Sequence, residues 1–158
     1  MMDINLLVID VDGTLTDGGM YYDAQGNEYK RFDTRDGMGI SRVRKKGIKV
    51  MILTGEDTQI VTHRAEKLQA DYCFIGVKNK VAKLEDFFGK YQEFSWETTA
   101  YIGDDVNDLD AMQRVAFAAS PVDAQPVVQE VSKYHCKAGG GHGAVREFCE
   151  VLITGIKL

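Results

Sequence analysis

The chain has 158 residues, of which 44% are hydrophobic and 27% charged, a balance typical of one soluble globular domain. Its net charge of −5 and isoelectric point near 5.2 argue against nucleic-acid and anionic-membrane partners, which require a broad basic surface. Three cysteines without a Cys-x-x-Cys pair argue against disulfides and zinc, so we expect reduced thiols. No apolar run approaches the ~20 residues of a membrane span, and no export signal is apparent, so we expect a cytoplasmic protein.

The first predicted element is a buried strand over residues 6–9. This run is rich in branched side chains, too short for a helix, and followed directly by Asp10 and Asp12. Gly13 permits a sharp exit of the backbone. Two carboxylates at the end of a buried strand are costly unless positive charge compensates them, and a divalent cation with oxygen ligands fits. The alternative is a strand that ends in a plain polar turn.

The rest of the chain alternates between predicted strands and helices. Aromatic residues on both sides of an Ala-Gln-Gly-Asn turn predict a β-hairpin over about 18–33. Asp36 is expected to cap the next helix, and the glycines of 139–143 to form a flexible joint. Further strands are predicted at 48–53, 72–75, 100–103 and 116–118, and helices at 36–46, 57–69, 79–89, 107–113, between Pro121 and Pro126, and from 144 to about 153. This order predicts an α/β fold, a parallel sheet with helices on both faces.

Polar residues follow several of these apolar segments. Thr54 and Gly55 follow the strand at 48–53, Lys80 opens a helix, and Asp104 comes directly after the strand at 100–103. Ligands in open α/β sheets bind outside the carboxyl ends of the strands. We therefore expect these residues to share one site with Asp10.

This ordered set of motifs resembles that of the haloacid dehalogenase-like phosphatase superfamily. The matching residues are Asp-Val-Asp-Gly-Thr at 10–14, Thr54, Lys80 and Gly-Asp-Asp-Val-Asn-Asp at 103–108. The resemblance implies a Rossmann-like sheet. Most members insert a cap domain, but here only the hairpin and one helix separate Asp12 from Thr54. We therefore expect one domain over 1–158 that has a hairpin flap and no cap.

The whole chain resembles the capless sugar-acid phosphatases of the 3-deoxy-D-manno-octulosonate 8-phosphate phosphatase family, through residues 10–18, 32–40, 101–108 and 140–147. The resemblance implies a homotetramer in which a neighbouring subunit completes the site. Exposed Met20, Tyr21 and Tyr22 would suit such an assembly, although the hairpin as a flap on its own domain is the alternative.

The same resemblance implies the roles of the motif residues. Asp10 would be the nucleophile that forms an aspartyl-phosphate, and Asp12 the general acid and base. Mg²⁺ would be held by the Asp10 carboxylate, the Asp12 backbone carbonyl and Asp104. Thr54 would hydrogen-bond the transferring group and Lys80 would neutralise its charge.

Three further residues of the last motif are predicted to support this site. Asp108 would hold Lys80 or a metal-bound water, and Asp105 would share that outer role. Asn107 is expected to cap the helix that follows it.

The substrate would carry a phosphate at one end and a 2-keto carboxylate at the other, so a second anion site is expected. Glu56 departs from eight-carbon-specific relatives, which commonly carry arginine there. Together with Lys67 it favours a nine-carbon substrate, 2-keto-3-deoxy-D-glycero-D-galacto-nononate 9-phosphate. The alternatives are the eight-carbon acid and a non-catalytic oligomerisation module. The predicted substrate-binding residues are Asp12, Arg35, Thr54, Gly55, Glu56, Arg64, Lys67, Lys80 and Arg146.

Overall fold

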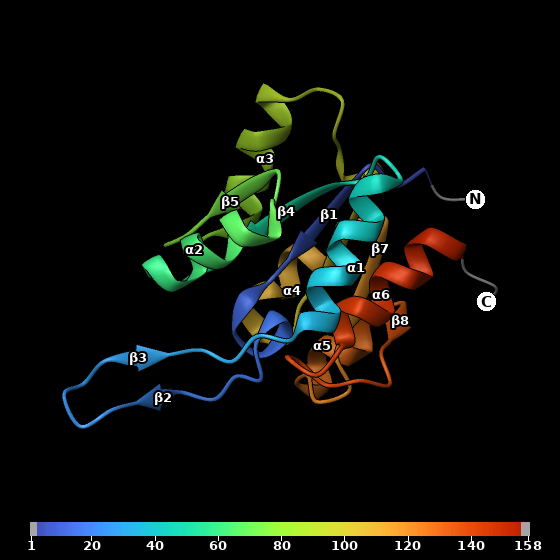
Figure 1. Ribbon diagram of the computed structural model, residues 1–158. Helices are drawn as coiled ribbons and strands as arrows, with labels where there is room; N and C mark the ends of the chain where they lie inside the picture. The colour runs from blue at the N-terminus through green and yellow to red at the C-terminus, as the bar shows by residue number, and fades with distance from the viewer. Residues whose placement is uncertain (1–2, 156–158) are drawn as a thin grey trace.

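A six-stranded parallel sheet organises residues 3–155, the part of the chain that the computed structural model describes (Figure 1). The strand order is β5-β4-β1-β6-β7-β8, and every neighbouring pair is parallel. The strands are Leu6–Ile9 (β1), Lys49–Leu53 (β4), Tyr72–Phe74 (β5), Thr99–Ile102 (β6), Phe117–Ser120 (β7) and Tyr134–His135 (β8). The α/β fold is therefore confirmed, and its first strand lies at the centre of the sheet.

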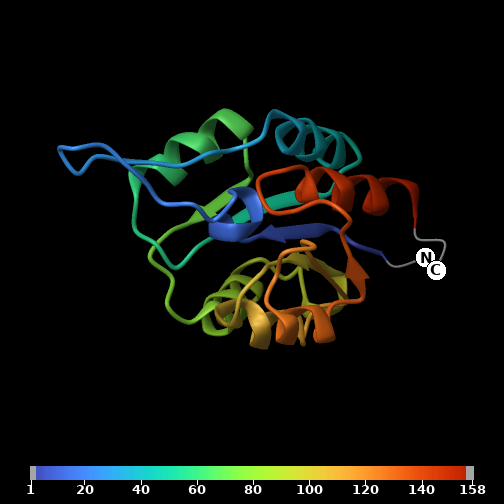
Figure 2. The same ribbon diagram turned by 90° about the horizontal axis from the view of Figure 1, so that it is seen from below.

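Three helices cover each face of the sheet (Figure 2). One layer consists of Thr34–Lys45 (α1), Gln59–Leu68 (α2) and Ala144–Thr154 (α6), and the other of Lys80–Lys90 (α3), Val106–Met112 (α4) and Pro126–Val131 (α5). Successive strand residues point to opposite faces, so Leu7 enters the first core and Val8 the second. Burial on both faces explains the continuous apolar run.

The prediction that Asp36 caps α1 is wrong. Asp33 is the N-cap, and its side chain accepts a hydrogen bond from the backbone amide of Arg35 at 2.7 Å. Asp36 lies in the first turn, where it is fully buried against α6 and accepts a hydrogen bond from the amide of Arg146 at 2.9 Å. Burial raises the pKa of Asp36 to about 6.

The prediction that Asn107 caps α4 is also wrong. Asp105 is the N-cap, and Asp108 completes a reciprocal capping box with it. Asn107 is exposed in the first turn of the helix. Asp104, Asp105, Asn107 and Asp108 are all possible N-cap residues, so the sequence alone does not determine where the helix begins. The burial of Asp108 decides it, because Asp108 then lies in the first turn and Asp105 becomes the N-cap.

Two features near the C-terminal part of the sheet differ from expectation. The predicted helix between Pro121 and Pro126 is a turn, and α5 begins at Pro126 instead, where a missing backbone donor is tolerated. Strand β8 was not predicted, because two residues are too few to show a pattern.

The helix predicted over 57–69 is shorter in the structure. It spans Gln59–Leu68, because Thr58 is its N-cap.

The hairpin extends away from the body of the protein (Figure 1). Its strands are Tyr21–Tyr22 (β2) and Glu28–Tyr29 (β3), which pair antiparallel. Besides this hairpin, residues 6–90 form one irregular turn, three strands of the sheet and the helices α1, α2 and α3, so the structure describes no cap in this region. Met20, Tyr21, Tyr22 and Tyr29 are exposed on the hairpin.

None of the helices described between residues 3 and 155 combines the length and apolarity needed to cross a membrane. Cys73, Cys136 and Cys149 are free thiols, as expected. Burial raises the pKa of each thiol, which makes these cysteines poor nucleophiles.

Candidate active site

The candidate site lies at the carboxyl ends of the central strands. Asp10 directly follows β1, Thr54 directly follows β4, and Asp104 lies two residues beyond β6. Lys80 is the first residue of α3 and is buried. Because parallel strands end at the same edge of a sheet, Asp10, Thr54 and Asp104 lie at one edge as the sequence predicts, and Lys80 contacts Asp10 there.

Lys80 joins two buried carboxylates. Its ammonium donates to Asp10 Oδ1 and to Asp108 Oδ1, each at 2.6 Å. All three side chains are almost completely buried. A buried ion pair of this kind requires close geometry to offset the loss of hydration, so the Lys80 ammonium fixes the position of the Asp10 carboxylate.

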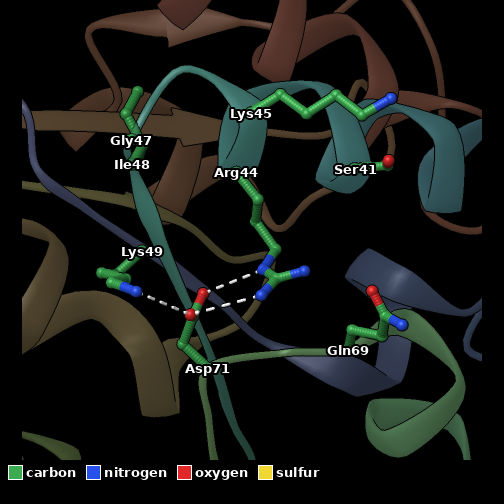
Figure 3. A pocket seen from close by; sticks show the side chains of 8 residues that line it. All are labelled: Ser41, Arg44, Lys45, Gly47, Ile48, Lys49, Gln69 and Asp71. Carbon is green, nitrogen blue, oxygen red and sulfur yellow. Dashed lines mark hydrogen bonds and ion pairs between the residues drawn. The ribbon is translucent and has the colours of Figure 1, made fainter.

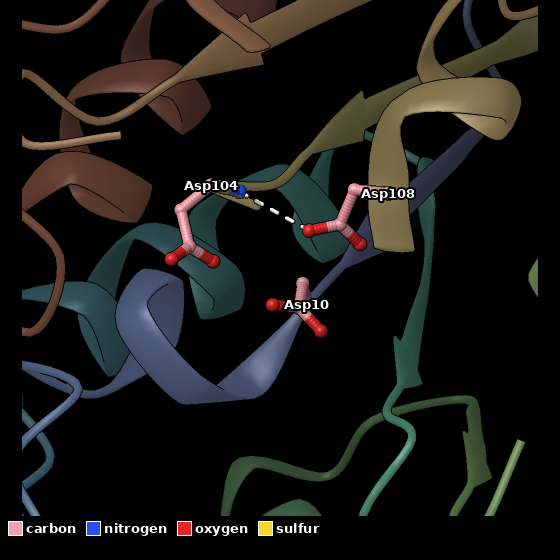
Figure 4. A group of neighbouring side chains, drawn as sticks. All are labelled: Asp10, Asp104 and Asp108. Atoms are coloured by element: carbon pink, nitrogen blue, oxygen red, sulfur yellow. Dashed lines mark hydrogen bonds between the residues drawn. The ribbon is translucent and has the colours of Figure 1, made fainter. Parts of the chain in front are cut away.

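Asp10, Asp104 and Asp108 point toward one another (Figure 4). One oxygen from each lies within 4.8 Å of the others. Burial, and then the neighbouring Asp108, raises the pKa of Asp10, and burial raises the pKa of Asp104 to about 6. Burial opposes the charge of Lys80, but Asp10 and Asp108 raise its pKa above the ordinary value.

This cluster therefore combines three carboxylates with one ammonium. Excess buried negative charge on oxygen ligands is the chemistry that Mg²⁺ binds. The residues present thus fit the divalent cation that the sequence predicts.

Both carboxylate oxygens of Asp108 accept hydrogen bonds within the cluster. Its Oδ1 accepts from the hydroxyl of Tyr101 at 2.6 Å as well as from Lys80. Its Oδ2 accepts from the backbone amides of Asp104 at 3.1 Å and Asp105 at 3.4 Å. Asp108 therefore contacts Lys80, one of the two partners expected for it, and its supporting role stays a prediction. The buried Tyr101 was missed, since a tyrosine in an apolar strand gives no sign of such a contact.

Two glycines allow the loop after Asp10 to pack tightly. This loop is a single irregular turn, Val11–Leu15 (η1), in which Gly13 has a φ of +83°. A Cβ on Gly13 would collide with the Asp104 carboxylate, and one on Gly140 would collide with the carbonyl oxygen of Gly13. The amide of Gly141 donates to the carbonyl of Thr14 at 3.1 Å. The expectation of a flexible joint at 139–143 is therefore wrong, because this segment packs against the loop.

A second ionic cluster lies at the outer side of the site. Lys30, in the arm that returns from the hairpin, donates to Asp12 Oδ1 at 2.6 Å and to Glu56 Oε2 at 2.9 Å. Sequence reasoning named both carboxylates but missed Lys30, because the path of the hairpin brings it to them. The amide of Glu56 also donates to Thr54 Oγ1 at 3.3 Å, so Glu56 and Gly55 lie beside the site.

The remaining predicted cations lie elsewhere. Arg35 pairs with Asp33 at 2.9 Å, and Arg146 pairs with Glu150 at 2.8 Å. Arg64 packs on the ring of Phe32 and donates to the carbonyl of Asp33, and Lys67 is exposed. Within residues 3–155, no hydrogen bond or ion pair joins these four cations to Asp10 or Asp12. Their role in binding a carboxylate stays a prediction.

A separate basic hollow of about 330 Å³ lies near the amino ends of β4 and β5 (Figure 3). Asp71 pairs there with Arg44 at 3.0 Å and Lys49 at 3.1 Å, and accepts from the amide of Val50 at 2.9 Å. These contacts join α1 to the sheet. Because Arg44 and Lys49 are already paired with Asp71 and the hollow lies at the opposite end of the strands from Asp10, this hollow is not the candidate site.

Comparisons with known proteins agree with this geometry. No family model matches the sequence. The 3-deoxy-D-manno-octulosonate 8-phosphate phosphatase of Escherichia coli K12 is 36% identical over 151 residues, covering 96% of this chain and 80% of that protein.

Solved structures of similar proteins share the fold. A probable YrbI family phosphatase from Pseudomonas syringae has a TM-score of 0.94 and 38% identity, covering 97% of this chain and 86% of that one. A 3-deoxy-D-manno-octulosonate 8-phosphate phosphatase from Moraxella catarrhalis, in complex with magnesium, phosphate and KDO, has a TM-score of 0.92 and 35% identity, with coverage of 97% and 87%.

Proposed function

Because the chain belongs to the 3-deoxy-D-manno-octulosonate 8-phosphate phosphatase family of haloacid dehalogenase-like phosphatases, we propose that it hydrolyses the phosphate monoester of a 2-keto-3-deoxy sugar acid. The observation that carries this proposal is the buried arrangement of Asp10, Lys80 and Asp108, with Asp104 beside it. It combines a carboxylate nucleophile with cationic charge and oxygen ligands for a metal ion.

In the first step, Asp10 attacks phosphorus while the bond from phosphorus to the sugar oxygen breaks. Asp12 gives its proton to the departing oxygen, which leaves an aspartyl-phosphate on Asp10. In the second step, a water gives a proton to Asp12 and attacks phosphorus. Inorganic phosphate departs, Asp10 regains its carboxylate, and Asp12 is again protonated.

The other residues reduce the repulsion between a carboxylate and a phosphate dianion. Lys80 lies 2.6 Å from Asp10 and would neutralise charge on the phosphoryl group. Thr54 is buried at the end of β4, where its hydroxyl would donate to a phosphoryl oxygen. Asp10, the carbonyl of Asp12 and Asp104 would hold Mg²⁺, which supplies further positive charge to the phosphoryl oxygens.

Two sugar acids are the candidates for the substrate. The names of the relatives support the eight-carbon acid, 3-deoxy-D-manno-octulosonate 8-phosphate. The position of Glu56 favours the nine-carbon acid, 2-keto-3-deoxy-D-glycero-D-galacto-nononate 9-phosphate, because a carboxylate beside Thr54 would accept hydrogen bonds from the hydroxyls of a longer sugar. Phosphate release from both compounds, measured as kcat/KM, tests the proposal and ranks the substrates.

The variant Glu56→Arg tests what this residue contributes to substrate choice. If Glu56 binds hydroxyls of the longer sugar, the variant should lower kcat/KM for the nine-carbon substrate by about tenfold to a hundredfold, which corresponds to roughly 1.5–3 kcal/mol. The loss should be smaller for the eight-carbon substrate, for which Glu56 would act only through its contact with Lys30, so the preference should shift toward that substrate. Lys67→Ala, tested alongside, should raise KM for both because it would lose a contact with the shared carboxylate. Equal losses for both substrates in Glu56→Arg would show that Glu56 does not discriminate between them.

Neither sugar acid would be hydrolysed by a non-catalytic oligomerisation module. The residues Asp10, Asp12, Thr54, Lys80 and Asp104 are all present, which favours an enzyme. Absence of turnover on both substrates would favour the module instead.

We also propose that the enzyme is a homotetramer whose sites are completed by neighbouring subunits. The support is the lack of a cap over residues 6–90 and the exposed side chains of the hairpin. Met20→Asp or Tyr21→Asp should dissociate the tetramer and lower activity together, because a charge on the contact surface opposes burial. Light scattering and phosphate release test this. Val122→Asp is the matched control, since Val122 is exposed and lies outside the hairpin. A fully active monomer would contradict the proposal.

A further inference from the structure

The hairpin brings Lys30 into contact with the site. Its ammonium lies 2.6 Å from Asp12 Oδ1, 2.9 Å from Glu56 Oε2 and 3.5 Å from Glu28 Oε1. The Lys30 side chain is only 3% exposed, whereas those of Asp12 and Glu56 are 36% and 45% exposed. Because the Lys30 ammonium contacts three carboxylates and its side chain is buried, its position is well defined.

Asp12 depends on Lys30 for its placement. Within residues 3–155, Lys30 is the only side chain that forms a hydrogen bond with the Asp12 carboxylate. The Asp10 carboxylate, in contrast, is held by Lys80 from the sheet-covering layer. The two carboxylates of the Asp-x-Asp motif are thus positioned by different parts of the fold, and the hairpin positions the second.

We propose that Lys30 is a positioning residue for Asp12, and that Glu56 anchors the Lys30 ammonium in the orientation that this requires. The inference rests on the proposed function, in which Asp12 protonates the departing oxygen. A general acid must lie within hydrogen-bond reach of that oxygen, and a misplacement of about 1 Å can cost roughly a hundredfold in rate.

The test compares Lys30→Met, which keeps the length of the side chain but removes its charge, with Lys30→Arg, which keeps the charge. The substrates are a sugar acid phosphate, propyl phosphate and p-nitrophenyl phosphate. For each, kcat/KM reports the steps up to departure of the leaving group. p-Nitrophenolate leaves without a proton, whereas the two alkoxides require one.

Lys30→Met should therefore lower kcat/KM by about tenfold to a hundredfold for both alkyl phosphates and by less than about threefold for p-nitrophenyl phosphate. Lys30→Arg should recover part of the loss. Lys90→Met is the matched control, because Lys90 is exposed and pairs with the exposed Asp86 on the same helix. Circular dichroism verifies that each variant folds.

Two outcomes would overturn the proposal. Equal losses for all three phosphates would assign Lys30 to the fold alone, and a loss confined to the sugar acid would assign it to sugar binding. Because propyl and p-nitrophenyl phosphate decide the point by themselves, failure of the sugar acids as substrates would contradict only the proposed function.

A double-mutant cycle tests the part of the proposal that concerns Glu56. If Glu56 acts through Lys30, Glu56→Gln should lower turnover of propyl phosphate in the wild-type background and have no further effect in Lys30→Met. Additive effects of the two substitutions would contradict the anchoring role.

Discussion

Replacement of Asp10 by asparagine is expected to reduce phosphate release by roughly 10⁴-fold or more, since the variant lacks the attacking carboxylate but keeps its size. The amide can still accept a hydrogen bond from Lys80, which lies 2.6 Å away, so the fold should persist. Steady-state phosphate release measures the loss, and circular dichroism measures the fold.

Two controls distinguish the effect of losing the nucleophile from the effect of losing one negative charge. Asp110→Asn removes an exposed carboxylate on α4 and should leave activity near that of the wild type. Mg²⁺ binding to Asp10→Asn, measured by calorimetry, shows how much of the effect comes from the metal site. Turnover near the wild-type level in Asp10→Asn would contradict the assignment of Asp10.

Removal of divalent cations should abolish most of the activity, by about a hundredfold to a thousandfold. The cluster holds three carboxylates, two of them buried and one partly buried, but one ammonium, so a phosphate dianion would meet uncompensated negative charge. EDTA should abolish the activity, and added Mg²⁺ should restore it. Ca²⁺ should inhibit, because its larger and looser coordination disturbs in-line attack.

A second measurement of the metal site is independent of activity. Mg²⁺ should raise the temperature of thermal unfolding of the wild-type protein, since a ligand bound only to the native state stabilises it. The shift should be lost in Asp104→Asn. Full activity in metal-free buffer, or equal thermal shifts in both proteins, would contradict the proposed metal ligands.

The central part of the site could be predicted because each element carries a local pattern. An apolar run of four residues followed by Asp10 indicates both a buried strand and a polar strand end. The same holds for Thr54 after β4 and for Asp104 after β6. Parallel strands place these ends at one edge, so a pattern within each strand is enough to predict their convergence.

Contacts between distant segments could not be predicted in the same way. Nothing in the sequence around Lys30 indicates that the hairpin returns to Asp12, 18 residues earlier. Asp33 and Asp36 are both good N-cap residues, and only the packing of α1 against α6 buries the second and leaves the first to cap. The choice between Asp105 and Asn107 likewise depends on the burial of Asp108.

The close contact between Gly140 and Gly13 has a consequence for biosynthesis. The N-terminus of a nascent chain leaves the ribosome first. Asp10 and its loop therefore emerge long before residues 139–143, which pack against that loop. The central strand β1 must also await β4 and β6 to find its neighbours on either side. A nascent chain therefore exposes Asp10 and Asp12 without the surroundings that give them their chemistry. The surroundings of Asp10 are therefore complete only after residues 139–143 have emerged from the ribosome and packed against this loop.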